Sequence, residues 1–271
     1  MSIIAKTRRW FNRLPLAGSP VGDQVRDDFI SKLHTICGDG DFVRLLWLPK
    51  KGDTTTTTSE EKDSRVFTYD ATIAARISNL GSGVSVDFDG TDDEADVPDN
   101  DDFTFGDSLS DKPFSVVVLC KPDVNNALMT LLAKSNSATA EEWELFLDAS
   151  GHLNFALLDE SATATLEARY AAAVGTDWVL LGGTYNGIGG IGGLAVYTNG
   201  VSRAVTNDSS GTYVAMENTA ALVHLGARYT TKERFFNGPK ALVLLAAGKE
   251  LTQDEMYQIT KAVNAFFDLA L

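Results

Sequence analysis

The stretch "VSVDFDGTDDEADVPDNDDFTFGD", residues 84–107, is the most informative part of the sequence for predicting the fold. It contains nine Asp and one Glu and has no Lys or Arg. Apolar residues recur among these acids, at Val86, Phe88, Val97, Phe103 and Phe105. Gly or Pro residues separate the apolar positions, as expected where an extended chain turns. The stretch therefore predicts a strand, a crossing loop and a second short strand, with most of its acids on the solvated side.

Short apolar runs separated by turn residues continue from Arg65 onward, and about twelve of them have the composition of strands. Trp143, Leu145 and Leu147 alternate with their neighbours, which predicts a half-buried strand with its other face exposed. The dipeptide Asn199-Gly200 lies between two such runs and predicts a two-residue hairpin turn. The pattern predicts an all-β fold, an antiparallel β-sandwich.

Two helices are expected beside these strands. Residues 19–37 place apolar side chains at spacings of three and four, and Gly38 follows as a stop. Near the end, Thr252 and Glu255 form a capping box. An apolar stripe follows the box, at Met256, Ile259, Val263, Phe266 and Phe267. We expect this stripe to pack on the sandwich or on the first helix, rather than to bind a partner.

The chain is thus predicted to have three parts. Residues 1–40 form a basic arm and an amphipathic helix that dock or brace the protein. Residues 41–250 form the sandwich, in which the polar segment 50–64, "KKGDTTTTTSEEKDS", is expected to be a loop. Residues 251–271 form a C-terminal helix packed on the sandwich.

The first thirteen residues contain no acid and interleave cations with aromatic side chains. The residues of this arm are Lys6, Arg8, Arg9, Trp10, Phe11 and Arg13. Such a segment docks on an acidic surface of a neighbouring protein, lies on a membrane or is a mobile terminus, and docking is our preferred interpretation. No apolar run is long enough to cross a membrane and no secretion signal is recognised, so we expect synthesis in a cytoplasm without membrane insertion.

Composition excludes several classes of function. The formal charge of −14 opposes binding to nucleic acid phosphates. Cys37 and Cys120 are the only cysteines and are expected to be buried thiols. The histidines His34, His152 and His224 have no second ligand close in sequence, so no zinc site is predicted. Motifs of zinc proteases and α/β-hydrolases are also absent from the sequence.

Carboxylates are the abundant reactive groups. Glu142 and Glu144 lie on one side of the strand predicted at "EEWELFLD", which is the arrangement that a glycoside hydrolase needs. An exposed strand face without catalytic function is the preferred interpretation. In the acidic stretch, Asp89, Asp92 and Asp99 are the candidate calcium ligands, since calcium prefers carboxylate oxygens. No other cofactor is predicted.

The acidic stretch followed by "PFSVVVLCKPD" resembles the opening of a laminin-G-like, concanavalin A-like jelly-roll domain. Later segments resemble the family in order, including "EWELFLDASGHLNF", "DWVLLGGTYNG" and "FFNGPKALVLL", over roughly residues 41–260. The resemblance implies a mostly non-catalytic module that binds carbohydrate or protein, with calcium on the rim in several members. Ala241 and Leu242 stand where relatives usually carry acids, which weakens the expectation of calcium here.

The N-terminal arm and the segment "YVAMENTAALVHLG" resemble the corresponding segments of jelly-roll proteins of tailed bacteriophages. This resemblance implies a non-enzymatic virion protein, a capsid decoration or tail-associated part. It would contact other virion proteins, form a homo-oligomer, stabilise the particle and bind cell-surface glycans. Fold analogy alone carries this step.

Two alternatives remain. One is a carbohydrate-binding adhesin, calcium-dependent or not, with glycan contacts at Trp143, Tyr185, Tyr229 and Phe235. The other, less favoured, is a glycoside hydrolase that uses Glu142 and Glu144.

Overall fold

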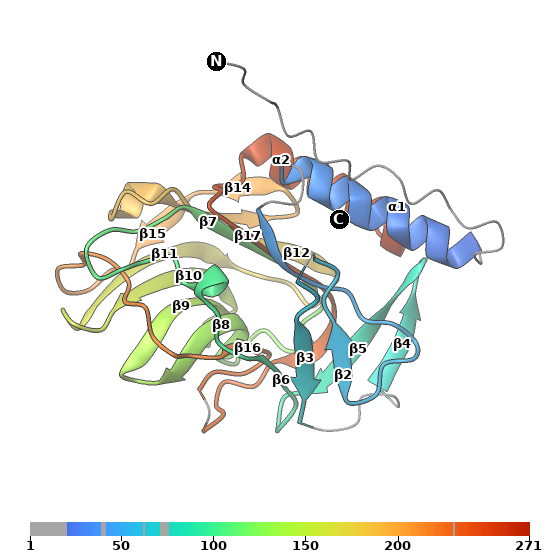
Figure 1. Cartoon of the computed structure of the whole chain (residues 1–271), viewed down its shortest axis with the longest axis horizontal. Helices are drawn as coiled ribbons and strands as arrows, with labels where there is room; N and C mark the ends of the chain where they lie inside the picture. Colours follow the sequence, from blue (N-terminus) through green and yellow to red (C-terminus); the bar gives the residue numbers. More distant parts are fainter. Residues whose placement is uncertain (1–20, 39–41, 62, 71–75, 230) are drawn as a thin grey trace, which may run out of the picture.

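The computed structural model describes residues 21–38, 42–61, 63–70, 76–229 and 231–271. Two antiparallel β-sheets face each other, and two helices lie together over the outer face of one sheet (Figure 1). The predicted all-β jelly-roll sandwich with an N-terminal and a C-terminal helix is confirmed. Among the described helices, none has both the length and the apolar character needed to span a membrane.

The first sheet has eight strands, and the long strand β17 organises it by pairing with β7 on one side and with β5 and β1 on the other. Its strands are, in spatial order, β14 (Val201–Arg203), β13 (Leu194–Thr198), β12 (Val179–Tyr185), β7 (Phe114–Cys120), β17 (Asn237–Ala247), β5 (Gly83–Asp89) and β4 (Ile77–Leu80), with β1 (Val43–Trp47) paired to β17.

The second sheet has nine strands and carries Ala95–Val97 of the acidic stretch near one edge, while the start of the stretch forms β5 in the first sheet. Its strands are, in spatial order, β15 (Val205–Asn207), β11 (Ala164–Ala173), β10 (His152–Asp159), β9 (Ala140–Leu147), β8 (Met129–Ser137), β16 (Val223–Leu225), β6 (Ala95–Val97), β3 (Val66–Tyr69) and β2 (Thr56–Thr58). Short 3-10 turns η2 (Asp101–Phe103) and η3 (Ile191–Gly193) lie in the connections.

Aromatic side chains fill the space between the sheets. Phe114 stacks on Phe105 with ring centroids 4.0 Å apart and meets Phe155 edge-on at 5.5 Å. Trp143 lies 5.8 Å from Phe114 and is fully buried. The apolar anchors of the acidic stretch, Phe103 among them, belong to the same core. These rings anchor the stretch in the core, and most of its acids lie on the rim and the surface, although Asp93 and Glu94 are buried.

Two segments differ from the sequence prediction. The threonine run predicted as a loop contains strand β2, since β-branched side chains suit an edge strand that pairs with β3. The run "VSRAVT", residues 201–206, which is one of the two runs that flank Asn199-Gly200, divides at Ala204 instead of forming one strand. Its first half, β14, pairs with β13 in one sheet, and its second half, β15, pairs with β11 in the other.

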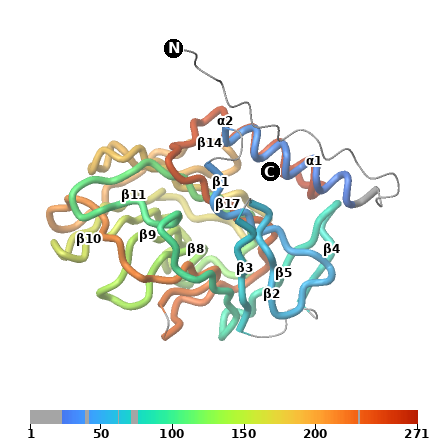
Figure 2. The backbone as a smooth tube through the Cα atoms, in the orientation of Figure 1, coloured from blue at the N-terminus to red at the C-terminus, as the bar shows by residue number. Residues whose placement is uncertain are grey.

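Helices α1 (Val21–Ile36) and α2 (Gln253–Phe267) lie side by side over β1 and β17 (Figure 2). Phe29 of α1 stacks on Phe266 of α2, with centroids 4.2 Å apart and planes at 5°. The capping box of Thr252 and Glu255 is present as predicted, and the apolar stripe behind it packs on the sheet and on α1. The helices cover apolar side chains that would otherwise face water.

The Asn199-Gly200 hairpin is confirmed between β13 and β14. Both residues have positive φ, 53° and 74°, as the tight turn requires. A Cβ on Gly200 would lie 2.7 Å from Oγ1 of Thr260 in α2. The turn thus needs glycine for its backbone conformation and for its contact with the helix.

Lys240 is fully buried in β17, against the inter-sheet core. Its ammonium lies 4.0 Å from the ring centroid of Phe236 and 4.9 Å from that of Phe88, and donates one hydrogen bond of 3.2 Å to the Leu131 carbonyl. No carboxylate forms an ion pair with it among the described residues. Burial lowers the pKa of Lys240 to about 7.

We expect Lys240→Met to raise the free energy of unfolding at pH 6 by roughly 2 kcal/mol, because it removes a poorly compensated buried charge. Between pH 7 and 10 the unfolded wild-type chain binds more protons at this position, so wild-type stability rises with pH and the advantage of the variant shrinks. Urea denaturation at several pH values measures both effects. Lys32→Met, on the exposed face of α1, is the control, and parallel pH profiles for wild type and Lys240→Met would contradict the assignment.

Candidate functional site

A row of side chains crosses the outer face of the nine-stranded sheet. Strand pairing aligns one residue from each of seven strands, namely Thr68, Asp96, His224, Ala133, Glu144, Ala156 and Glu167. Paired residues point to the same side of a sheet, and Trp143 next to Glu144 points into the core. The row therefore gathers ionisable groups from distant parts of the chain on the side away from the core.

Glu144 lies in the middle of this row and is held by three partners. Its carboxylate accepts hydrogen bonds from Oγ1 of Thr130 at 2.6 Å and from Nη1 of Arg234 at 3.1 Å. Nε of Arg228 lies 3.6 Å away. Burial raises the pKa of Glu144, and the two guanidinium groups oppose this shift.

Glu142 is also buried and committed. It is paired with the buried ammonium of Lys134 at 2.5 Å and accepts hydrogen bonds from the backbone and hydroxyl groups of Thr219, each at 2.9 Å. The prediction of an exposed strand face is therefore wrong, because the connection between β16 and β17 and the segment at Thr219 supply groups that cover it. Glu142 and Glu144 do not form a free pair facing a cleft.

Glu167 ends the row and is half-buried. The pKa of Glu167 is raised to about 7, mainly by burial and then by the nearby carboxylates of Asp208 and Glu144. Arg169 opposes this shift only in part. Near neutral pH this side chain therefore exists in both protonation states and can donate or accept a hydrogen bond.

The predicted glycan contacts do not form one site. Trp143 and Tyr185 are fully buried, so their assignment as glycan contacts is wrong. The Trp143 indole donates to the Phe103 carbonyl at 2.9 Å, and the Tyr185 hydroxyl donates to Asp111 at 2.7 Å. Their alternating positions suit the core as well as the surface, which sequence alone did not distinguish. Tyr229 and Phe235 are half-buried in the connection between β16 and β17.

The predicted calcium ligands also separate. Asp89 and Asp92 lie close to Asp93. One carboxylate oxygen from each of the three residues lies within 4.8 Å of the other two. Arg76 pairs with Asp93 and lies 3.9 Å from Asp89, so a cation already occupies this corner. Asp99 pairs with Lys134 at 2.9 Å instead. The three predicted residues therefore do not converge on one ion.

The predicted docking residues Lys6, Arg8, Arg9, Trp10, Phe11 and Arg13 lie outside the described residues. The described part of the arm is α1, whose apolar side faces α2 and the sheet.

A groove of about 330 Å³ crosses the outer face of the eight-stranded sheet, beside the part that the helices cover. Trp178, just before β12, forms its apolar side. Its polar lining comes mainly from β4, β5 and the end of β7, and the lining residues besides Trp178 are Ser78, Asn79, Leu80, Ser85, Asp87, Lys121 and Pro239. Trp178 was not among the residues predicted from sequence. Residues two apart in a strand point to the same face, so the pattern does put Trp178 on the outer face together with Leu180.

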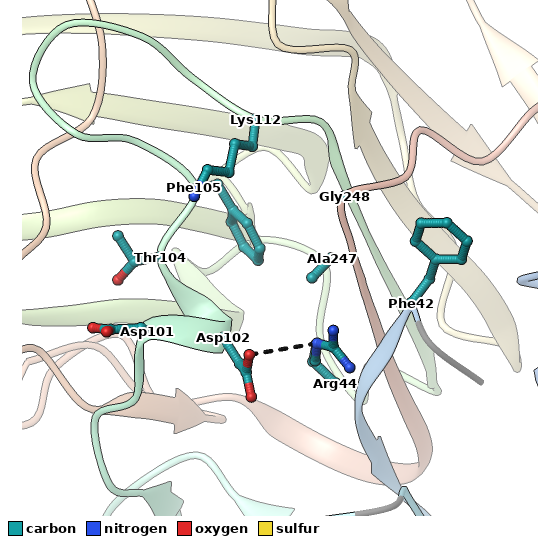
Figure 3. A pocket seen from close by; sticks show the side chains of 9 residues that line it. All are labelled: Phe42, Arg44, Asp101, Asp102, Thr104, Phe105, Lys112, Ala247 and Gly248. Carbon is teal, nitrogen blue, oxygen red and sulfur yellow. Dashed lines mark ion pairs between the residues drawn. The ribbon is translucent and has the colours of Figure 1, made fainter. Parts of the chain in front are cut away.

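A second hollow, of about 250 Å³, lies where β1, η2 and the end of β17 meet (Figure 3). Phe42 and Phe105 supply its aromatic surface. Arg44 and Asp102 point toward one another across it, with Nε and Oδ1 3.5 Å apart. Its main charges thus neutralise each other.

Several solved structures share this fold. The receptor-binding domain of botulinum neurotoxin D superposes with a TM-score of 0.59 at 13% identity, covering 82% of this chain and 53% of that one. Domain 4 of the arabinanase AbnA from Geobacillus stearothermophilus, solved with arabinotriose, gives 0.52 at 14%, covering 81% and 98%. This chain spans about half the length of the toxin domains. At these identities the likeness shows the fold alone.

The sequence itself identifies the family. No curated protein sequence matches the chain. The family model described as the concanavalin A-like lectin/glucanases superfamily matches residues 89–255, from the acidic stretch to the start of α2. This match includes most strands of both sheets and agrees with the jelly-roll topology. The chain therefore belongs to the concanavalin A-like lectin/glucanase superfamily.

Proposed function

We propose that this chain is a non-catalytic, lectin-like module that binds carbohydrate in the Trp178 groove. The observation that carries the proposal is the lining of this groove, where one half-buried indole lies among amide, hydroxyl, carboxylate and ammonium groups. Sugars present a C–H face that packs on aromatic rings and hydroxyl groups that both donate and accept hydrogen bonds. A few polar groups around an apolar surface are typical of such sites.

The groove offers both kinds of partner. Asn79 is exposed and provides a donor and an acceptor, while Asp87 accepts and Lys121 donates. Burial raises the pKa of Asp87, and nearby Asp123 adds to this shift. A volume of about 330 Å³ is small among ligand pockets, so it suits one or two sugar units.

Proteins of similar fold support a carbohydrate ligand. Domain 4 of AbnA was solved with arabinotriose. The binding domain of botulinum neurotoxin DC, with a TM-score of 0.55 and 14% identity, was solved with SialylT. The same neurotoxin domain was also solved with rat synaptotagmin II, so a protein ligand is the alternative class.

The absence of catalysis is supported by the state of the candidate carboxylates. A glycoside hydrolase needs one carboxyl group that donates a proton and a second that is free to attack or to activate water. Glu142 and Glu144 are each buried in ion pairs and hydrogen bonds to neighbouring side chains. Their contacts support a structural role in closing the outer face of the sheet.

We place this module in a bacteriophage virion, as a capsid decoration or tail-associated protein. The support comes from sequence: a basic, aromatic segment in residues 1–13 precedes a strongly acidic chain. Opposite charges on the two parts suit docking of the segment on an acidic neighbour while the acidic sandwich faces outward. Homo-oligomer formation belongs to the same proposal.

Carbohydrate binding is tested on a glycan array with the full chain, with and without calcium, followed by calorimetry with the best oligosaccharide. We expect Trp178→Ala and Asn79→Ala each to weaken binding about tenfold, or roughly 1.4 kcal/mol. Tyr257→Ala removes an exposed aromatic side chain on α2 and should leave affinity unchanged. Thermal melting shows whether Trp178→Ala stays folded, and a flat array in both conditions would remove the carbohydrate proposal.

We expect Glu144→Gln to lower the free energy of unfolding by roughly 3 kcal/mol, because Arg234 loses its buried partner and Arg228 loses one of two, the other being Glu141. Glu233→Gln is the matched control, since Glu233 is half-exposed and approaches the same two arginines at 3.9 and 3.6 Å. That change should cost less than about 1 kcal/mol. Chemical denaturation measures both. A Glu144→Gln variant of wild-type stability that loses hydrolysis of a glucan would instead indicate catalysis.

Deletion of residues 1–18 tests the docking role. We expect the truncated chain to fold and to bind sugar as the full chain does, but to be missing from particles assembled with the proteins encoded beside it. Replacing Lys6, Arg8, Arg9 and Arg13 by Gln should reduce incorporation in the same direction, since it removes the positive charge. Quantification of the chain in purified particles gives the result, and normal incorporation of the truncated chain would exclude docking by this segment.

A further inference from the structure

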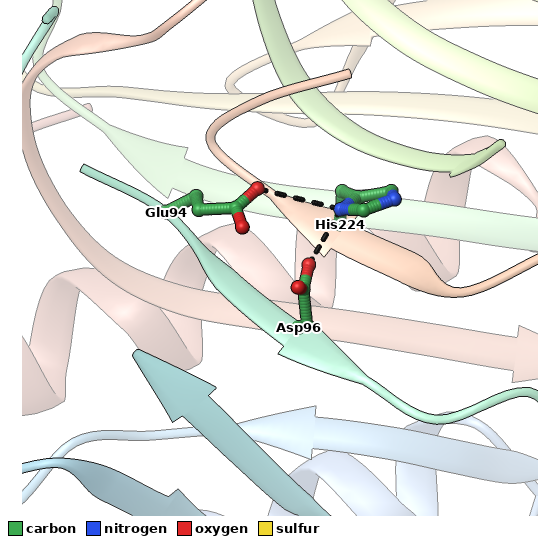
Figure 4. Close-up of side chains that lie close together, drawn as sticks. All are labelled: Glu94, Asp96 and His224. Atoms are coloured by element: carbon green, nitrogen blue, oxygen red, sulfur yellow. Dashed lines mark ion pairs between the residues drawn. The ribbon is translucent and has the colours of Figure 1, made fainter. Parts of the chain in front are cut away.

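Glu94, Asp96 and His224 converge on the outer face of the nine-stranded sheet (Figure 4). Glu94 and Asp96 are two residues apart at strand β6, so both side chains point to the same side. His224 is the direct partner of Asp96 in the ladder between β16 and β6. Backbone pairing therefore fixes the relative positions of the three side chains.

The donor atoms face one another. Nδ1 of His224 lies 3.4 Å from Oε2 of Glu94 and 2.5 Å from Oδ1 of Asp96. All three donor atoms lie within 4.8 Å of each other. In a tetrahedral zinc site, donors about 2.1 Å from the metal are about 3.4 Å apart. The first distance already fits, and a small rotation of the Asp96 carboxylate opens the second.

The site is buried and poorly satisfied by the protein. The side chains of His224 and Glu94 are fully buried, while that of Asp96 is 24% exposed. Among the described residues, neither oxygen of Glu94 and neither ring nitrogen of His224 has a hydrogen-bond partner of good geometry. The buried imidazole of His224 thus points toward two carboxylates without forming well-oriented hydrogen bonds to them. The partly exposed Asp96 connects the cluster to solvent.

Charges around the cluster leave room for a divalent cation. Lys232 contacts Glu94 and also Asp70, so one ammonium faces two carboxylates. With Asp96 there are three carboxylates and one lysine, and a neutral His224 leaves a net charge of −2. A divalent ion between Glu94, Asp96 and His224 neutralises the cluster and leaves Lys232 to Asp70.

A proton on His224 is the competing occupant. A single proton adds one positive charge and leaves Nε2 without a partner among the described residues, as a metal bound at Nδ1 also would. The proton would also leave the cluster with one uncompensated negative charge. A metal bound at Nδ1 keeps the ring neutral and supplies two positive charges, so it satisfies more of this site than a proton does.

We propose that Glu94, Asp96 and His224 form a binding site for one divalent transition-metal ion of the Zn²⁺ type. One imidazole nitrogen and two carboxylate oxygens are ligands that such ions accept. Three protein ligands leave a fourth position, on the exposed side of Asp96, for water. The sequence predicted no zinc site because the histidine and the acids are more than a hundred residues apart and only strand pairing unites them.

This site is independent of the Trp178 groove, which lies on the other sheet, so its test does not depend on sugar binding. Untagged full-length chain is stripped with EDTA and titrated with Zn²⁺ at pH 7.5. We expect one ion bound per chain by calorimetry. We also expect a rise in melting temperature of roughly 5 °C at about 100 times the dissociation constant. Co²⁺ should give the visible absorption of a tetrahedral site.

Variants identify the ligands. Asp96→Asn keeps the shape of a partly exposed side chain and should weaken Zn²⁺ binding at least tenfold, as should His224→Gln if it folds. Asp92→Asn, in the other acidic cluster, is the matched control and should bind as the wild type does. Lys232→Gln removes the cation that competes for Glu94 and should bind Zn²⁺ as tightly as the wild type or more tightly.

Two results would overturn the proposal. One is the absence of a Zn²⁺-dependent rise in melting temperature together with silent calorimetry, which would leave His224 as the partner of two acids. The other is loss of binding in Asp92→Asn with normal binding in Asp96→Asn, which would place the ion in the acidic loop.

Discussion

The fold depends on the burial of both faces of the central strands β7 and β17. All seven residues of β7 are buried, and side chains alternate between Val116, which faces the other sheet, and Val117, which faces the helices. A strand that is apolar on both faces must be covered on both. The second sheet covers one side and the pair α1 and α2 covers the other, so the helices are a third layer of the core. The helices leave uncovered the part of the sheet where the Trp178 groove lies.

The outer face of the nine-stranded sheet is also covered, but by charged side chains in ion pairs rather than by helices. Within the described part of the chain no α-helix lies over this face, and the strand β9 is nevertheless buried on that side. Arg228 and Arg234, from the connection between β16 and β17, cover Glu144, while Lys134 covers Glu142. Ion pairs that are removed from water are costly unless every charge has partners. The network explains why acids that resemble a catalytic pair in sequence are structural in this protein. The cluster around His224 is less completely paired.

Much of the architecture was predictable because its causes are local. Alternation at Trp143, Leu145 and Leu147, the Asn199-Gly200 turn and the capping box at Thr252 each reflect backbone geometry within a few residues. The site was predicted poorly for the opposite reason. Trp143 and Tyr185 are aromatic residues in strands, and a strand pattern gives the period of burial without saying which face meets the core. Trp178 lines the groove through its place beside strands that are distant in sequence.

The jelly-roll sandwich and its two flanking helices could be predicted from the amino-acid pattern, and the acidic stretch with its apolar anchors indicated the superfamily. Three features became evident only in the folded chain: which acids are paired, which aromatic residue lines the groove and which side chains lie close enough to share a metal ion. The physical reason is that strand registers bring together residues such as Asp96 and His224, and burial then determines whether each charge needs a partner. The sequence shows how many charged side chains the chain has, whereas the fold determines which of them lie next to each other.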